Sequence, residues 1–278
     1  MRGTTVARQT STMQKTSSPR REGTQALDRA VRLLRLVARR GRIGWHLTEL
    51  AANAGIGAST AHRILAALTR QRLVQRMEGD RRYYPGPLLF ELGASLPAMS
   101  VFVDRCKPAL AEISRTVGAA TMLSLRSDDD FVCVAKAGTD PNVTLAVEVG
   151  TRQPLVTSIA GIAMLLAMDR REAERLVRAN FADMAAPDRK IAILRRLWRD
   201  CKARGESVFL GETLPGVHGF AVVLLDRAGL PFGGLSTLGP AAALPLERGQ
   251  EILRYLRAKA VGLQEAYEGV SGAGSVRE

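Results

Sequence analysis

The stretch from residue 47 to residue 68 constrains this chain most, because its apolar spacing predicts two short helices joined at a glycine. In the first helix Leu47 and Leu50 share one face, and Thr48 is placed to cap the helix start. Gly55 then supplies the positive φ that ends a helix. Two short helices that meet at such a turn indicate a helix-turn-helix.

The second of these helices carries small polar and basic residues at its leading end. Its buried stripe is formed by Ile64, Leu65 and Leu68, and Ser59 or Thr60 is placed to cap its start. The opposite face presents four polar or basic side chains: Ser59, Thr60, His62 and Arg63. We therefore predict that this helix lies in the major groove of DNA.

Arg63 and His62 differ in what the pattern predicts for them. A guanidinium can pair bidentately with guanine and discriminate against other bases by about 1–3 kcal/mol, so Arg63 is expected to read the sequence. For His62 two roles stay open, a contact with DNA or packing between helices. Thr48, at the start of the first helix, is counted with the residues expected at the DNA.

Charge is concentrated in the same part of the chain. The net charge is +13; residues 1–90 hold 17 Lys or Arg against 5 Asp or Glu, whereas residues 91–278 hold 23 against 22. This polarity indicates a polyanionic partner at one end of the molecule. Residues 1–23 are predicted to be a disordered basic tail, either solvated or lying on DNA phosphates. For the arginines of the helix predicted over residues 25–40 the same two alternatives remain, a solvated face or contact with DNA phosphates.

A second basic element follows the helix-turn-helix. Two short β segments within residues 73–85, around a Gly/Asp turn, predict a hairpin. Beside a recognition helix, a basic hairpin is typical of a wing, and Arg81 and Arg82 would follow the sugar-phosphate backbone or enter the minor groove, with Tyr83 next to them. The alternative is an edge hairpin whose arginines are solvated.

The segment after the wing is apolar. A helix is predicted from Pro87 to Leu96, opened by one proline and closed by another, Pro97. A helix this apolar between two domains is either a dimer seam or a linker packed on both. A further helix is predicted over residues 104–117, where the composition becomes neutral.

The rest of the chain mixes strands and helices. Strands are predicted at 120–126, 131–137, 143–149, 205–210, 219–226 and 232–238, and helices at 159–168, 170–179, 187–204 and 246–267. This order indicates an α/β domain with a mainly antiparallel sheet and a pocket between sheet and helices. The acidic run at 127–130 lacks the spacing and glycine of a calcium loop, so a β-turn is predicted there.

Several classes of protein are disfavoured. Cys106, Cys133 and Cys201 are far apart without metal-ligand spacing, which favours structural thiols in a reducing compartment. No apolar run has the length of a membrane span, and the first residues lack the apolar core of a signal peptide. We therefore expect a cytoplasmic protein without a membrane partner, metal or cofactor.

Two other functions compete with a DNA-binding regulator. An enzyme is disfavoured because no nucleophile–base pair is apparent, and His218 is isolated in an expected turn. A purely architectural DNA-binding protein is disfavoured because coating DNA does not require the neutral domain of nearly 180 residues that follows residue 98.

Three strings carry a resemblance to a known family. QALDRA at 25–30, LTELA at 47–51 and STAHRIL at 59–65 resemble the IclR-type family of bacterial transcription regulators, with YYPGP at 83–87 and LSTLGP at 235–240 in support. The resemblance implies an α+β protein: a winged helix-turn-helix, a linker helix, and a GAF-like α/β effector-binding domain with a mainly antiparallel sheet. It also implies a homodimer or homotetramer that binds a double-stranded DNA operator and a small-molecule effector.

The expected organisation follows from the resemblance and the composition together. It comprises a basic tail (1–23), the winged helix-turn-helix domain (24–86), the linker helix (87–98), the effector-binding domain (99–270) and a short tail (271–278).

Departures from the family pattern shape the expected ligand. Ala58 stands where the family often has Lys, which removes one phosphate contact, and Gly219 stands where it often has Cys. The resemblance places the effector contacts at eight residues: Thr157, Ser158, Ala160, Gly161, Phe209, Gly219, Ser236 and Leu238. With fewer polar groups and more room expected, the pocket favours a larger, more apolar ligand such as an aromatic acid. The alternative is a regulator whose pocket has degenerated and that acts without a ligand.

Overall fold

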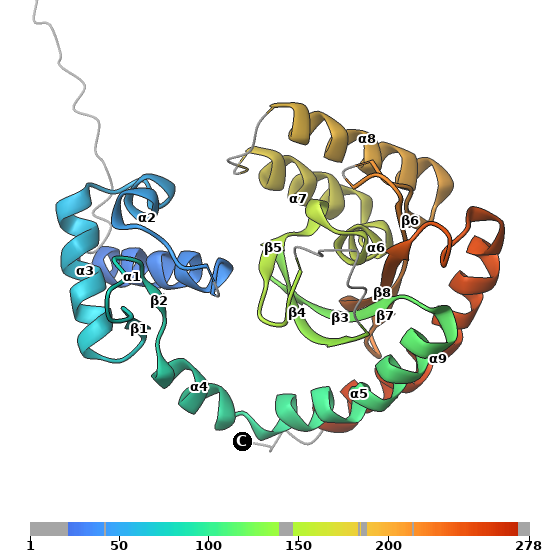
Figure 1. Cartoon of the computed structure of the whole chain (residues 1–278), viewed down its shortest axis with the longest axis horizontal. Coiled ribbons are helices and arrows are strands. Elements are labelled where there is room, and N and C mark those ends of the chain that lie inside the picture. The colour runs from blue at the N-terminus through green and yellow to red at the C-terminus, as the bar shows by residue number, and fades with distance from the viewer. Residues whose placement is uncertain are drawn as a thin grey trace, which may run out of the picture.

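The computed structural model describes residues 22–41, 43–138, 147–182, 184, 188–212 and 214–271. They form an N-terminal domain and a larger C-terminal domain, with a short helix running between them (Figure 1). The predicted tails at 1–23 and 271–278 fall almost wholly outside the described residues, as does most of the strand predicted at 143–149.

The N-terminal domain is the predicted winged helix-turn-helix. It contains α1 (Glu22–Arg39), α2 (Leu47–Ala54), α3 (Ala58–Arg70), β1 (Val74–Gln75) and β2 (Tyr84–Pro85). The three helices close around Leu33, Leu50 and Leu65, which are fully buried. Gly55 ends α2 with φ of +62°, as the sequence predicted. The two strands pair antiparallel and form the wing.

The helix starts differ from the sequence prediction. Thr48 does not cap α2, because the helix begins after His46, whose backbone N–H donates to the Glu49 carboxylate at 3.1 Å. At α3 the cap position is held by Gly57 in an extended conformation. Ser59 and Thr60 therefore lie in the first turn of α3 rather than before it, and neither caps the helix as predicted.

Two helices follow the wing. α4 (Pro87–Ala94) and α5 (Pro97–Val117) meet at a bend, so Pro97 opens a second helix as well as closing the first. No residue of α4 is buried, and the side chain of Phe90 is 80% exposed. This contradicts a linker helix packed on both domains. Among the described residues, no single helix is long and apolar enough to cross a membrane. α4 and residues 98–117 have that length and composition only together, and they are bent by 88° where they meet.

The C-terminal domain is built on one antiparallel sheet of six strands. In spatial order these are β5 (Arg152–Pro154), β4 (Asp130–Ala137), β3 (Ala120–Ser127), β8 (Pro231–Pro240), β7 (Val217–Leu225) and β6 (Ser207–Phe209). The predicted turn at 127–130 is confirmed, because Ser127 pairs with Asp130 and Asp128 has φ of +57°. β5 was not predicted, and His218 lies within β7 rather than in a turn.

Helices cover both faces of this sheet. α5 and α9 (Gly249–Ser271) run along one face, where Phe220 and Leu235 are fully buried against them. α6 (Ile159–Ala167) lies on the other face, and α7 (Arg170–Ala182) and α8 (Asp188–Arg204) lie beyond it (Figure 1). Two 3₁₀ turns, Leu155–Thr157 and Leu246–Arg248, precede α6 and α9.

Candidate DNA interface and effector site

The exposed face of α3 carries the residues predicted to read DNA. Ser59, His62 and Arg63 are exposed, and Thr60 is half-buried. Because His62 points to solvent, the alternative of a helix-packing histidine is wrong. α3 lies on the side of its domain that is away from the C-terminal domain (Figure 1). The face is therefore open to a large ligand such as a DNA duplex.

The wing is held by a short network of hydrogen bonds. The Tyr84 hydroxyl donates to the Asp80 carboxylate at 2.6 Å, and the backbone N–H of Arg82 donates to the same side chain at 2.9 Å. These bonds hold the pKa of Asp80 below its ordinary value, the Tyr84 hydroxyl contributing most. Arg81 is exposed and free to reach a phosphate, whereas the Arg82 side chain donates to the Ile43 carbonyl at 3.3 Å and lies at 3.3 Å from His46 Nε2.

Tyr83 is a correction to the predicted DNA contacts. Its side chain is 5% exposed and packs in the core of the N-terminal domain, with the Arg76 guanidinium 5.5 Å from its ring centroid. Its backbone pairs with Trp45 in an isolated bridge. Successive residues of an extended segment point to opposite faces, so Tyr83 faces the core when Arg82 faces outward. Arg76 is exposed on this wing and was not predicted.

A cluster of ion pairs joins the two domains. The Asp130 carboxylate accepts from Arg39 of α1 at 3.0 Å and from Arg152 of β5 at 2.8 Å. Arg35 of α1 lies 3.4 Å from the neighbouring Asp128. The side chain of Asp130 is only 12% exposed, so its charge is well shielded from water and held by two guanidinium groups. The amino-acid pattern of this acidic run predicts only a turn, because its ion-pair partners are distant in sequence.

The sheet register brings several predicted effector residues side by side. Phe209 pairs with Gly219, and Gly219 pairs with Leu238, so the three lie in one row across β6, β7 and β8. Ser236 is two residues along β8 on the same face and is 2% exposed. The row faces α6, because Ile159 is the nearest side chain from outside the sheet at Gly219. We call this surface the α6 seam.

The start of α6 supplies the remaining predicted residues. The Ser158 hydroxyl accepts from the Gly161 N–H at 2.9 Å and so caps the helix. Thr157 donates to the Pro154 carbonyl at 2.7 Å. The Ala160 backbone and Cβ lie against Gly234 of β8. Both hydroxyls are thus already engaged in local hydrogen bonds.

The extra room expected at the α6 seam is not present. A Cβ added at Gly219 would collide with the side chain of Leu238 and lie 2.8 Å from that of Ile159. A Cβ added at Gly161 would collide with the Leu155 backbone. The space vacated by the missing cysteine is thus filled by neighbouring apolar groups, and a ligand would have to displace them. The predicted effector contacts stay predictions.

The described residues offer little catalytic chemistry. Burial raises the pKa of Cys106 and of Cys133 to about 11, which keeps both thiols protonated near neutral pH. His218 Nδ1 is engaged with the Leu244 carbonyl at 2.9 Å. Within the part of the chain that the structure describes, no group of three His, Cys, Asp or Glu could hold a metal ion.

Two family models match this chain. The model described as the IclR helix-turn-helix domain matches residues 26–78, and the model described as the bacterial transcriptional regulator IclR C-terminal domain matches residues 96–264. The chain is 29% identical over 222 residues to the HTH-type transcriptional regulator BhcR of Paracoccus denitrificans, and this covers 78% of each. It is 23% identical over 233 residues to the transcriptional repressor IclR of Escherichia coli, which covers 81% of this chain and 83% of the relative.

Solved structures share the fold over nearly their whole length. An IclR transcriptional regulator from Alicyclobacillus acidocaldarius gives a TM-score of 0.64 at 26% identity, covering 87% of this chain and 98% of that one. An IclR homolog complexed with 4-hydroxybenzoate, from Microbacterium hydrocarbonoxydans, gives 0.63 at 19% identity, covering 88% and 99%. At that identity the second likeness shows the fold alone.

The wing network predicts a shifted titration. Tyr84→Phe should raise the pKa of Asp80 toward its ordinary value, because the lost phenol hydrogen bond is the largest cause of the lowering. A carboxyl with a depressed folded-state pKa stabilises the fold above its unfolded pKa, and the contribution is lost as pH falls through the folded pKa. The wild type should therefore be more stable than Tyr84→Phe near neutral pH, and this difference should be lost in acid.

NMR titration of the Asp80 carboxyl carbon measures this pKa shift. Denaturant unfolding near neutral pH and in acid measures the difference in stability. Tyr255→Phe, on α9, is the matched control and should leave Asp80 unaffected. An Asp80 pKa that is the same in Tyr84→Phe and in the wild type would contradict the assignment.

Proposed function

Because this chain belongs to the IclR family of bacterial transcription regulators, we propose that it is a regulator that reads an operator through α3 and responds to an aromatic or other apolar carboxylic acid. The observation that supports this best is the open face of α3 in the part of the chain, residues 1–90, that holds 17 Lys or Arg against 5 Asp or Glu. Cations on such a surface release counterions from DNA and hold the protein on the duplex. A chromosomal DNA partner would require the protein to be in the cytoplasm.

The residues of the interface divide by what they can contact. Arg63, exposed on α3, is the proposed base reader, with Ser59, Thr60 and His62 beside it. Arg81 would hold the wing on a phosphate. Thr48, in the first turn of α2, is exposed at the neighbouring helix start and would contact the backbone.

The DNA assignment predicts two distinct losses. The operator is first selected with the full-length chain from a pool of random duplexes. Arg63→Ala should then reduce the preference for the operator by about 1–3 kcal/mol, because the bidentate contact with a base is lost. Arg81→Ala should weaken binding to all duplexes alike. It should also reduce the slope of log K against log salt concentration by about one, because one phosphate contact is lost. Gel-shift titrations at several salt concentrations measure both.

Arg70→Ala, in the last turn of α3, is the control for removing a positive charge from the same helix. Sequence preference that survives in Arg63→Ala at wild-type strength would rule out this residue as the reader.

Exposed apolar side chains on α4 support a dimer. Phe90 and Leu92 of α4 are 80% and 52% exposed, and Leu96, two residues beyond the helix, is 60% exposed. Exposed apolar residues gathered on and beside one short helix favour burial against another protein surface. We propose that α4 of one protomer packs on its equivalent in a second copy, which would set the spacing of two α3 helices on a two-fold operator.

Charge on this helix should separate the protomers. We expect Phe90→Glu combined with Leu92→Glu to lower the mass in light scattering toward that of one chain, because the glutamates would be desolvated in the seam. Leu230→Glu, at an exposed turn of the C-terminal domain, should leave the mass unchanged. A double variant with the wild-type mass would exclude α4 as the dimer seam.

The effector part of the proposal rests on the C-terminal domain. The relative solved with 4-hydroxybenzoate supports an aromatic acid, and the row of Phe209, Gly219 and Leu238 supports the α6 seam as its site. The close packing of this seam favours the second candidate function, a regulator that acts without a ligand.

A thermal-shift screen of the full-length chain separates the two candidates. A ligand that binds only the folded state stabilises it by about 2.7 kcal/mol at a concentration one hundred times its Kd. We expect 4-hydroxybenzoate to raise Tm, and Ser236→Ala to reduce that rise. Ser100→Ala, exposed on α5, is the control. If no aliphatic or aromatic acid raises Tm, the ligand-independent function is favoured.

A further inference from the structure

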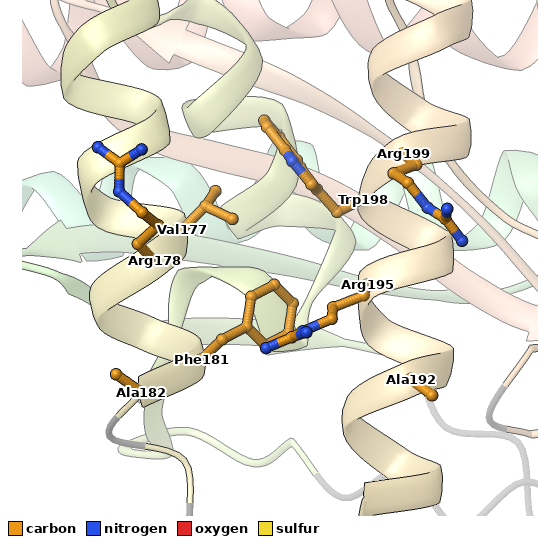
Figure 2. A pocket seen from close by; sticks show the side chains of 8 residues that line it. All are labelled: Val177, Arg178, Phe181, Ala182, Ala192, Arg195, Trp198 and Arg199. Atoms are coloured by element: carbon orange, nitrogen blue, oxygen red, sulfur yellow. The ribbon is translucent and has the colours of Figure 1, made fainter.

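An open cavity lies away from the α6 seam, between α7 and α8. It measures about 650 Å³, within the range of roughly 300–1,000 Å³ typical of small-molecule sites. Phe181 reaches into it from α7 and Trp198 reaches into it from α8 (Figure 2). Val177 lies between them and completes an apolar lining. No residue of the cavity belongs to the predicted effector contacts.

Three arginines surround this apolar lining. Arg178, Arg195 and Arg199 are exposed, and in the described ranges of the chain none of them forms an ion pair. Other cations on the same helices do have carboxylate partners: Arg170 with Glu174, Arg175 with Asp129, and Arg196 with Asp200. Among the described residues that line the cavity, none has an acidic side chain. Its rim therefore carries positive charge that a ligand could neutralise.

Rings and guanidinium groups together select one class of ligand. The Arg195 guanidinium crosses over the Phe181 ring, 5.2 Å from its centroid (Figure 2). A flat aromatic ring can stack beside Phe181 and Trp198, and a carboxylate on that ring can accept two parallel hydrogen bonds from a guanidinium. We propose that the cavity between α7 and α8 binds an aromatic carboxylate. Unlike the α6 seam, it accepts such a ligand without displacing a side chain from the sheet.

Contacts from α7 lead to the other domain. Asn180, next to Phe181 in the chain, is 4% exposed, and its amide donates to the Asp129 carbonyl at 2.9 Å. The Asn180 side-chain oxygen accepts from the Val156 N–H at 3.2 Å. The following residue of the hairpin, Asp130, holds Arg39 of α1 at 3.0 Å.

The cavity therefore stands two contacts from the DNA-binding domain. A ligand that repositions α7 would act on the β3–β4 hairpin through Asn180, and on α1 through Asp130. Such coupling requires that the ligand bind differently to the free and the DNA-bound protein. This part of the inference rests on the proposed function, because it needs a DNA-binding chain.

Calorimetry on the full-length chain tests the site. The probe is 1-naphthoate, with uncharged 1-naphthalenemethanol for comparison. We expect the carboxylate to bind more tightly than the alcohol, and Arg195→Gln to weaken naphthoate binding at least about tenfold while changing alcohol binding little. Arg196→Gln, the next residue of α8, should change naphthoate binding less than about twofold because its charge already faces Asp200. Ser236→Ala should not change it.

Three outcomes would overturn the site. Equal losses in Arg195→Gln and Arg196→Gln would mean that only the general positive charge of α8 matters. A loss confined to Ser236→Ala would place naphthoate in the α6 seam. A change of oligomeric mass in Arg195→Gln, with naphthoate binding intact, would mean that a second copy of the chain covers the cavity.

The link to DNA has its own measurement. Naphthoate should change the operator affinity of the wild type, and Asp130→Asn should abolish that change while keeping naphthoate binding. Asp104→Asn, whose side chain pairs with Lys107 on α5, is the control and should behave as the wild type. A ligand effect that persists in Asp130→Asn would refute the route through the hairpin. A wild type that binds no DNA would refute the proposed function and leave the calorimetric result for the site intact.

Discussion

The close approach of α6 to the sheet is the constraint on which the C-terminal domain depends. Two strand glycines permit it, Gly219 and Gly234, where an added Cβ would meet the Ile159 side chain and the Ala160 backbone of α6. A side chain at either of these positions would force the layers apart and open voids, which interiors packed at crystal density do not tolerate. The same packing that holds the domain together therefore closes the α6 seam.

With the α6 seam closed, the accessible cavity of this domain lies further from the sheet, between α7 and α8. α7 and α8 are not backed by another layer among the described elements, and Phe181 and Trp198, which are mostly buried, line the cavity between them. Apolar rings at the edge of a cationic surface bind anions that also carry apolar area, since neither water nor a simple ion satisfies both parts. A domain whose α6 seam is closely packed can thus still offer a site for an aromatic acid elsewhere, between α7 and α8.

The sequence predicted local structure well and distant partners poorly. Gly55 has one physical use at a helix end, so its turn was predictable. Tyr83 was misplaced because a hairpin of two-residue strands has too few alternating positions to show which face is buried. Asp130 was recognised only as part of a turn, since Arg39 lies 91 residues away. The α7–α8 cavity arises from the spacing of two helices, which amphipathic patterns do not specify.

The position of α3 limits how any ligand could act on DNA binding. This helix lies on the far side of its domain from the C-terminal domain, so a ligand bound there cannot block the reading face directly (Figure 1). What it can change is where the whole N-terminal domain is held. Two connections hold it, the chain through α4 and the ion pairs of Arg39 with Asp130 and of Arg35 with Asp128. Because no residue of α4 is buried, the ion pairs are the contact that sets α1 against the β3–β4 hairpin within one protomer. Regulation in a dimer would then consist of making or breaking this contact, which changes the spacing of two reading helices without altering either one.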